Sequence, residues 1–171
     1  QRLSRGLGDV YKRQDIYKHP LDKSHRFPMV KYELIPEQLL RENTCTPENF
    51  FVPGKINVND ILAAHKKTYL DKLDNQEFSK KEVRAIGFPM SPRLIVREKL
   101  IAQGTIEGAL SALKHGVAMN IAGGTHHAFS DRAEAFCILN DQAIAAKHLI
   151  NKNYCNKIMI LDLDVHQGNG N

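Results

Sequence analysis

The sequence lacks long apolar runs and is poor in cysteine, and each absence argues against a class of protein. Its apolar runs fall well short of the about 20 residues that a membrane-spanning helix needs, so we expect no membrane partner. The three cysteines, Cys45, Cys137 and Cys155, are odd in number and irregularly spaced. They indicate a reducing compartment rather than a disulfide framework. Since no apolar segment of the signal-peptide kind stands near the start, we expect a cytoplasmic location.

The sequence also lacks the basic clusters and interleaved aromatic residues of a nucleic-acid-binding surface. Its formal net charge is +5, but residues 1–14 carry +3 of this. Residues 9–14 (DVYKRQ) are the translation of a DNA string that matches a common sequencing-library transposon end, so we hypothesise that residues 1–14 are adapter-derived and not native. The remaining lysines are scattered. We therefore expect no direct nucleic-acid binding.

The rest of the chain predicts alternating helices and strands. Ser91 and Pro92 suit the N-cap and first position of a long helix, and Gly116 suits its end. The predicted order is helix 31–41, short helices within 58–73 starting near Asn59 or Asp60, a charged loop 75–84, helix 92–115, strand 117–122, loop 123–139, helix 141–150 capped by Asn140 or Asp141, and strand 158–163. Continuous apolar strands are typical of buried parallel sheets. The fold class expected is α/β, a parallel sheet flanked by helices.

The most informative segment is 157–170, where an apolar run ends in acidic residues, a histidine and a glycine-rich turn. Alternate side chains of a strand share a face, so Asp162, Asp164 and His166 would point the same way. A carboxylate and an imidazole at a strand end form a half-site for a divalent metal such as zinc. The alternative interpretation is a capped turn with solvated acids.

A second apolar run, 117–122, is also followed by residues that could form a functional site. Gly123 and Gly124 allow a tight turn, and His126 and His127 follow it. Taken alone, these histidines could be two metal ligands, two acid–base groups or a chance surface pair. Sites in parallel α/β sheets lie outside the carboxyl ends of the strands, which favours a shared site for both segments.

Three ordered motifs together closely resemble the histone deacetylase superfamily, which includes bacterial histone-deacetylase-like and acetoin-utilisation proteins. They are 123–128 (GGTHHA), 136–141 (FCILND) and 162–170 (DLDVHQGNG). The QGNG form of 167–170 is most similar to the class IV and related bacterial branch. The resemblance covers 15–171. It implies an arginase/deacetylase-like fold that is truncated at its C-terminus, with residues 15–171 as the N-terminal part of a catalytic domain.

The resemblance also implies a metal site. Asp164 and His166 match two of the three zinc ligands of the family, with Fe²⁺ as another candidate metal. A structural K⁺ is implied near Asp162, Asp164 and His166. The third ligand, an aspartate, and a tyrosine that stabilises the oxyanion would follow Asn171. The chain by itself is therefore expected to be inactive, since a catalytic zinc normally has three protein ligands.

Catalytic roles for four further positions follow from the same resemblance. His127 matches the proton shuttle and His126 its electrostatic partner. Asp162 matches the residue that pairs with His126, and Asn169 faces His127. Many family members have aspartate where this chain has Asn169. An amide cannot stabilise an imidazolium by charge, so we predict that His127 is less basic than in an aspartate-containing relative.

The expected substrate is an acetylated lysine, polyamine or similar amine. Phe136 matches an aromatic wall of the acyl-lysine tunnel, and its place between the two motif segments favours this slot over a core phenylalanine. Ala135 stands where relatives often have glycine, and its Cβ could narrow the tunnel or restrict φ.

Cys137 is interpreted as a buried structural thiol. Four other histidines are interpreted as surface or structural groups: His19, His65, His115 and His148.

The rival functions are another metallohydrolase of the same fold, such as a ureohydrolase, and a non-catalytic binding or assembly module. The oligomeric state is left open.

Overall fold

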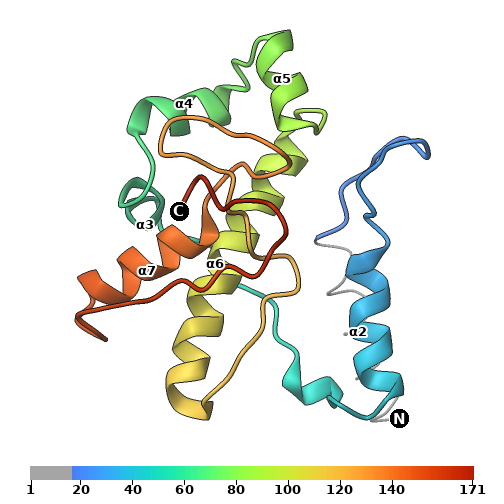
Figure 1. The fold of residues 1–171 in the computed structure, drawn as a ribbon, viewed down its shortest axis with the longest axis vertical. Helices are drawn as coiled ribbons and strands as arrows, with labels where there is room; N and C mark the ends of the chain where they lie inside the picture. Colours follow the sequence, from blue (N-terminus) through green and yellow to red (C-terminus); the bar gives the residue numbers. More distant parts are fainter. Residues whose placement is uncertain (1–16) are drawn as a thin grey trace. The chain divides into compact units, whose positions relative to one another are not determined.

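The computed structural model describes residues 17–171, which divide into two compact units after Val52. The hypothesis about residues 1–14 lies outside the described residues. The first unit contains helix α2 (Lys31–Arg41) and a short 3₁₀ helix η1 (Pro47–Asn49), shown in Figure 1. The predicted helix 31–41 is confirmed.

The second unit is built around one long helix. Its elements are α3 (Val58–Leu62), α4 (Lys67–Asn75), α5 (Lys80–Ile86), α6 (Pro92–His115) and α7 (Asp141–Asn151). In Figure 1, α6 runs through the middle of this unit and α7 crosses it, and α4 also packs on α6. The core that joins them consists of fully buried apolar side chains: Ile61, Leu73, Ile86, Leu94, Ile101, Ile106, Ile138, Leu139 and Ile144. Burial of each such side chain stabilises the fold by about 1.5–3 kcal/mol.

The ends of α6 and α7 lie where their capping residues predict. The Ser91 hydroxyl accepts a hydrogen bond from the Leu94 N–H (3.1 Å), and Gly116 ends α6 with φ of 89°. The Asn140 side chain caps α7. These caps satisfy backbone groups that a helix end leaves without intrahelical partners. Within residues 17–171, we find no helix with both the length and the apolar character needed to cross a membrane.

The prediction of a loop over 75–84 is wrong, because α5 begins at Lys80. Ser79 and Glu82 form a reciprocal capping box, in which each side chain accepts a hydrogen bond from the other's backbone N–H, at 3.3 and 2.9 Å. Ile86 then buries the last turn of the helix, with 1% of its surface exposed. The residue types of this capping box, serine followed three positions later by glutamate, are present in the sequence.

Neither predicted strand is formed, and the residues described here contain no sheet. Segments 117–120 and 157–163 have irregular backbone. Their apolar side chains face solvent, with Val117 80% and Met159 82% exposed. A strand is stable only when a neighbouring strand receives its backbone hydrogen bonds, and these two runs do not pair with each other. The parallel sheet therefore stays a prediction.

Candidate functional site

The two adjacent histidines lie on a turn that the first residue of α7 holds in place. Asp141 is 1% exposed, and its Oδ1 accepts hydrogen bonds from the backbone N–H groups of Thr125 (2.7 Å) and Gly124 (3.1 Å). The hydroxyl groups of Thr125 and Thr105 also donate to this carboxylate, each at 2.5 Å. Hydrogen bonds to a buried charge are among the stronger ones in proteins. Asp141 therefore fixes the backbone that carries the histidines.

Asn140 links the histidine turn to the C-terminal motif. Its Oδ1 caps α7 through the Ala143 N–H (2.9 Å), while its Nδ2 donates to the carbonyls of Ala128 (3.2 Å) and Gly170 (3.1 Å). The Gly170 N–H in turn donates to the carbonyl of His126 (2.8 Å). A Cβ at Gly170 would lie 2.5 Å from the Ala128 carbonyl oxygen, so this close approach requires glycine.

Each histidine of the turn is paired with an oxygen from the C-terminal motif. His126 Nδ1 lies 2.6 Å from Asp162 Oδ2, and His127 Nδ1 lies 2.7 Å from Asn169 Oδ1. The two rings are adjacent, with centroids 4.2 Å apart. Because oxygen accepts in both pairs, each neutral imidazole carries its proton on Nδ1 and keeps a lone pair on Nε2.

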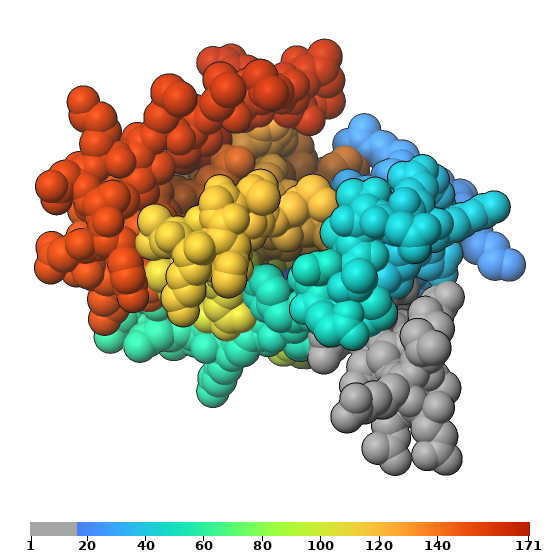
Figure 2. Space-filling view, turned by 90° about the horizontal axis from the view of Figure 1, so that it is seen from below, coloured from blue at the N-terminus to red at the C-terminus, as the bar shows by residue number. Residues whose placement is uncertain are grey.

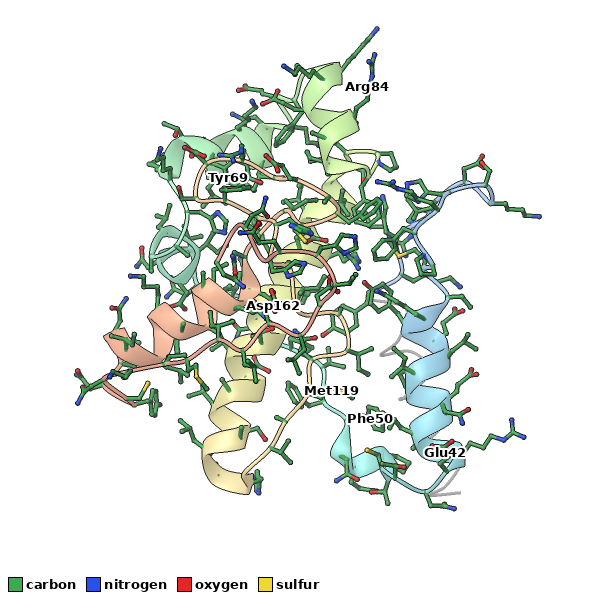
Figure 3. All side chains as sticks on the ribbon, in the orientation of Figure 1. Glu42, Phe50, Tyr69, Arg84, Met119 and Asp162 are labelled. Carbon is green, nitrogen blue, oxygen red and sulfur yellow. The ribbon has the colours of Figure 1, made fainter. Side chains whose placement is uncertain are left out.

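The two pairs differ in charge. The hydrogen bond from His126 holds the pKa of Asp162 below its usual value, so this carboxylate is ionised near neutral pH. Asp162 also accepts from the Asp164 N–H (3.0 Å), and Figure 3 labels it on the C-terminal segment. A carboxylate stabilises an imidazolium by charge, whereas the Asn169 amide does not. The His126 pair therefore has a charged acceptor, whereas the His127 pair has a neutral one.

Asp164 and His166 lie together on the exposed part of the C-terminal segment. His166 Nδ1 is 2.9 Å from Asp164 Oδ1, and the side chains are 72% and 50% exposed, respectively. Figure 2 shows the C-terminal residues on the outer surface of the molecule. The His166 ring lies 6.0 Å from that of His127. The hydrogen bond from the His166 backbone N–H lowers the pKa of Asp164, so this carboxylate is ionised near neutral pH.

The donor types fit zinc, but their number does not complete a site. Carboxylate and imidazole groups are ordinary zinc ligands, and a catalytic zinc normally has three of them plus water. Among residues 17–171, no group of three or more histidine, cysteine, aspartate or glutamate side chains is arranged to hold a metal. Asp164 and His166 therefore offer two donors of the types that zinc binds.

Ala135 and Phe136 lie on a tight turn closed by hydrogen bonds between Glu134 and Cys137. Both have left-handed backbone, with φ of 45° and 67°. The Phe136 ring packs on Phe88, with centroids 5.0 Å apart. The next residue, Cys137, interacts with the backbone N–H of His127, and burial raises the pKa of its thiol to about 12. The prediction of a buried structural thiol at Cys137 is confirmed, and this residue connects the Phe136 turn to the histidines.

The residues that sequence reasoning missed are those that support the histidines. Asn140 and Asp141 were expected only as helix caps, and Thr105 was given no role. A usable signal was present, because both cap residues directly follow the motif that begins at Phe136. Contacts between residues 36 positions apart, such as Thr105 with Asp141, carry no comparable local pattern.

The chain is similar to known proteins over most of its length. Residues 23–171 match the family described as histone deacetylase domain. An uncharacterized protein of Picosynechococcus sp. is 39% identical over 154 residues, covering 90% of this chain and 51% of the relative. The acetoin utilization protein AcuC of Staphylococcus aureus is 30% identical over 165 residues, covering 91% and 42%.

Solved structures give the same result. The crystal structure of an HDAC homolog from Aquifex aeolicus matches with a TM-score of 0.76 and 26% identity, over 92% of this chain and 44% of that one. An HDAC homolog complexed with SAHA matches with the same TM-score and coverage, at 27% identity. This similarity fits the arginase/deacetylase fold. The chain spans about half the length of the curated relatives it matches.

Proposed function

Because the chain belongs to the histone deacetylase domain family, we propose that the protein containing it is a zinc-dependent deacetylase of N-acetylated lysine or related amines. The observation that carries the proposal is the pair of imidazoles at His126 and His127, each with Nδ1 bonded to an oxygen. This pair lies beside two metal-type donors, Asp164 and His166.

The zinc would be held by Asp164 and His166, with the third ligand and an oxyanion-stabilising tyrosine following Asn171 in the longer protein. Fe²⁺ suits the same donors, and a structural K⁺ near Asp162 belongs to the same proposal. When bound, zinc would polarise the acetamide carbonyl and lower the pKa of water. The lengths of the relatives support this arrangement, since they extend well beyond the part that this chain matches.

His127 is proposed to move the proton. Its Nδ1 proton is engaged by Asn169, so the Nε2 lone pair can take a proton from the attacking water and return it to the leaving amine. His126 is proposed to assist electrostatically, because the ionised Asp162 favours positive charge there.

Phe136, supported by Ala135, is proposed to line the slot for the alkyl chain of the substrate. Phe136 is only partly buried, as expected for a side chain that contacts a ligand. The substrates proposed are acetylated lysine and acetylated polyamines, both of which present a linear alkyl chain next to the acetamide. We propose that the protein works in the cytoplasm.

The test is an assay of the complete gene product, loaded with zinc, on an acetyl-lysine peptide. We expect His127→Gln to reduce kcat by about 10² or more, the usual contribution of a positioned acid–base group. His148→Gln is the matched control, because His148 pairs with Asp60 (2.9 Å) away from this site. Equal activity of the two variants would refute the assigned role of His127.

A non-catalytic binding or assembly module is the second candidate, since no group of three or more histidine, cysteine, aspartate or glutamate side chains within residues 17–171 is arranged to hold a metal. Sequencing the gene past the codon for Asn171 separates the two proposals. An aspartate and a tyrosine encoded downstream support the enzyme. A gene without them supports a binding or assembly role.

A further inference from the structure

Outside the motif residues, the end of helix α5 makes an unexpected set of contacts with the turn that carries Phe136. The Ala135 N–H donates to the Ala85 carbonyl (2.9 Å), and the Phe136 N–H donates to the Ile86 carbonyl (2.7 Å). Carbonyl groups in the last turn of a helix have no intrahelical partner and attract donors. The turn of residues 134–137 is therefore docked onto the C-terminal end of α5, the helix on which Figure 3 labels Arg84.

The docked turn needs this support. Ala135 and Phe136 are two successive non-glycine residues with left-handed backbone, which costs free energy unless the surroundings hold it. Within the turn, Glu134 and Cys137 exchange backbone hydrogen bonds of 3.1 and 2.9 Å. Those two hydrogen bonds close the turn, and the two hydrogen bonds to α5 fix the position of the turn against the end of that helix.

Gly87, which ends α5, decides where the Phe136 ring lies. A Cβ built on Gly87 would be 2.6 Å from Cε1 of that ring, whereas ordinary contact begins at 3.4 Å. The ring thus lies directly against the bare Cα of Gly87. Phe88, 1% exposed, packs against the ring as well. Any side chain at position 87 must displace either the ring or the end of α5.

We propose that Gly87 is a positioning residue that sets the width of the substrate slot through Phe136. The inference rests on the proposed function only in that Phe136 lines the slot. It assigns a task to α5, whose sequence resembles a plain surface segment. A larger residue at position 87 displaces the Phe136 ring, so the slot fits the alkyl chain of the substrate less well.

The experiment compares Gly87→Ala with Gly116→Ala. Gly116 also ends a helix with positive φ, 89° against 82° for Gly87, but a Cβ there meets nothing within 4 Å. Both substitutions place a Cβ on a residue with positive φ, and only Gly87→Ala meets the ring. A 4-fluorophenylalanine placed at position 136 reports the ring environment by ¹⁹F NMR. We expect its resonance to move in Gly87→Ala and to stay in Gly116→Ala.

The kinetic arm uses the complete zinc-loaded protein and an acetyl-lysine peptide. A misfit of about one methylene in an apolar slot changes kcat/KM by about tenfold or more, so we expect Gly87→Ala to raise KM by about that factor with kcat little changed. Gly116→Ala should leave KM unchanged. Adding Phe136→Leu to Gly87→Ala should lower KM again, because leucine leaves room for the new methyl group.

Each outcome decides the proposal. An unmoved ¹⁹F resonance in folded Gly87→Ala refutes the contact between Gly87 and the Phe136 ring. A moved resonance with an unchanged KM refutes the role of Gly87 in setting the width of the substrate slot. If Gly87→Ala does not fold, rescue of folding by Phe136→Leu supports the clash, and failure of that rescue overturns it. If the complete protein does not deacetylate, the proposed function fails while the ¹⁹F comparison still decides whether Gly87 positions the ring.

Discussion

Glu98 is a buried carboxylate whose ionisation should oppose folding as the pH rises. Its side chain is 1% exposed, Arg97 bonds one of its oxygens, and no described residue donates a hydrogen bond to Oε2. Burial raises the pKa of Glu98 from 4.5 to about 7, and the neighbouring Asp141 adds to the rise while Arg97 opposes it. Burying charge with incomplete hydrogen bonding is costly, which is the physical cause of the shift.

The sign and size of the effect follow from proton linkage. The folded state binds the Glu98 proton more tightly than the unfolded state, so ionisation costs nothing below pH 4.5. The cost then grows until the pH passes about 7, the folded-state pKa. A rise from 4.5 to about 7 corresponds to a loss of about 3 kcal/mol in the free energy of unfolding.

His65 acts in the opposite direction over nearly the same range. Burial lowers the pKa of His65 from 6.5 to about 4, so its contribution to stability is full above pH 6.5 and is lost as the pH falls toward 4. Its Nε2 accepts a hydrogen bond from the Asn140 backbone N–H (3.0 Å), which needs the neutral ring. The two effects nearly cancel in the unmodified chain, so variants are needed to separate them.

The assay is urea unfolding, followed by circular dichroism from about pH 4.5 to pH 8, of the unmodified chain, Glu98→Gln and His65→Gln. The stability of Glu98→Gln minus that of the unmodified chain should rise by about 3 kcal/mol between pH 4.5 and 7. For His65→Gln the same difference should fall by a similar amount between about pH 4 and 6.5.

The change with pH in the stability difference between each variant and the unmodified chain tests the reasoning, whereas a constant difference does not. Below the folded-state pKa of about 7, Glu98 is neutral, so glutamine replaces a group of the same charge. A constant offset between the two chains then reflects the altered hydrogen bond with Arg97. If the difference for Glu98→Gln does not change with pH, burial does not hold Glu98 protonated and the reasoning is refuted. A falling difference for His65→Gln in the same experiments shows that the method resolves such slopes.

Three further predictions concern the caps and the site. Ser79→Ala should lower the free energy of unfolding by about 1 kcal/mol through loss of the α5 cap, measurable by urea unfolding; an unchanged midpoint would contradict the capping role. Asp141→Asn should loosen the turn of His126 and His127, seen as faster amide hydrogen exchange there, because a neutral amide replaces the buried charge that holds it. Asn169→Asp should move the NMR titration midpoint of His127 to higher pH, since a carboxylate stabilises imidazolium; a midpoint that stays or falls would be evidence against the pairing.

Much of the second unit was predictable, because helix ends are encoded locally. Ser91 and Gly116 mark the ends of α6 within one residue, and Asn140 marks the start of α7. The same kind of signal is present at Ser79, but the charge of residues 75–84 led to the prediction of a loop, so α5 was missed. The two predicted strands are not formed within the described residues, because a strand needs a partner strand whose place in the chain no local pattern fixes.

The family and the set of candidate site residues were readable from the sequence, since motifs such as 123–128 and 162–170 keep their residue types and order. The support of the site was not. Asp141 reaches the histidine turn from the start of α7, and Gly87 reaches Phe136 from the end of α5. These contacts join segments that no local pattern connects.

The sequence by itself determined the helix caps, the family and the chemical types of the site side chains, because each depends on residues close together in the chain. The tertiary structure decided which groups lose water and which meet, such as the buried Glu98 and the ring of Phe136 against Gly87. Burial and contact depend on distance in space, and folding alone brings residues from distant parts of the chain to the same place.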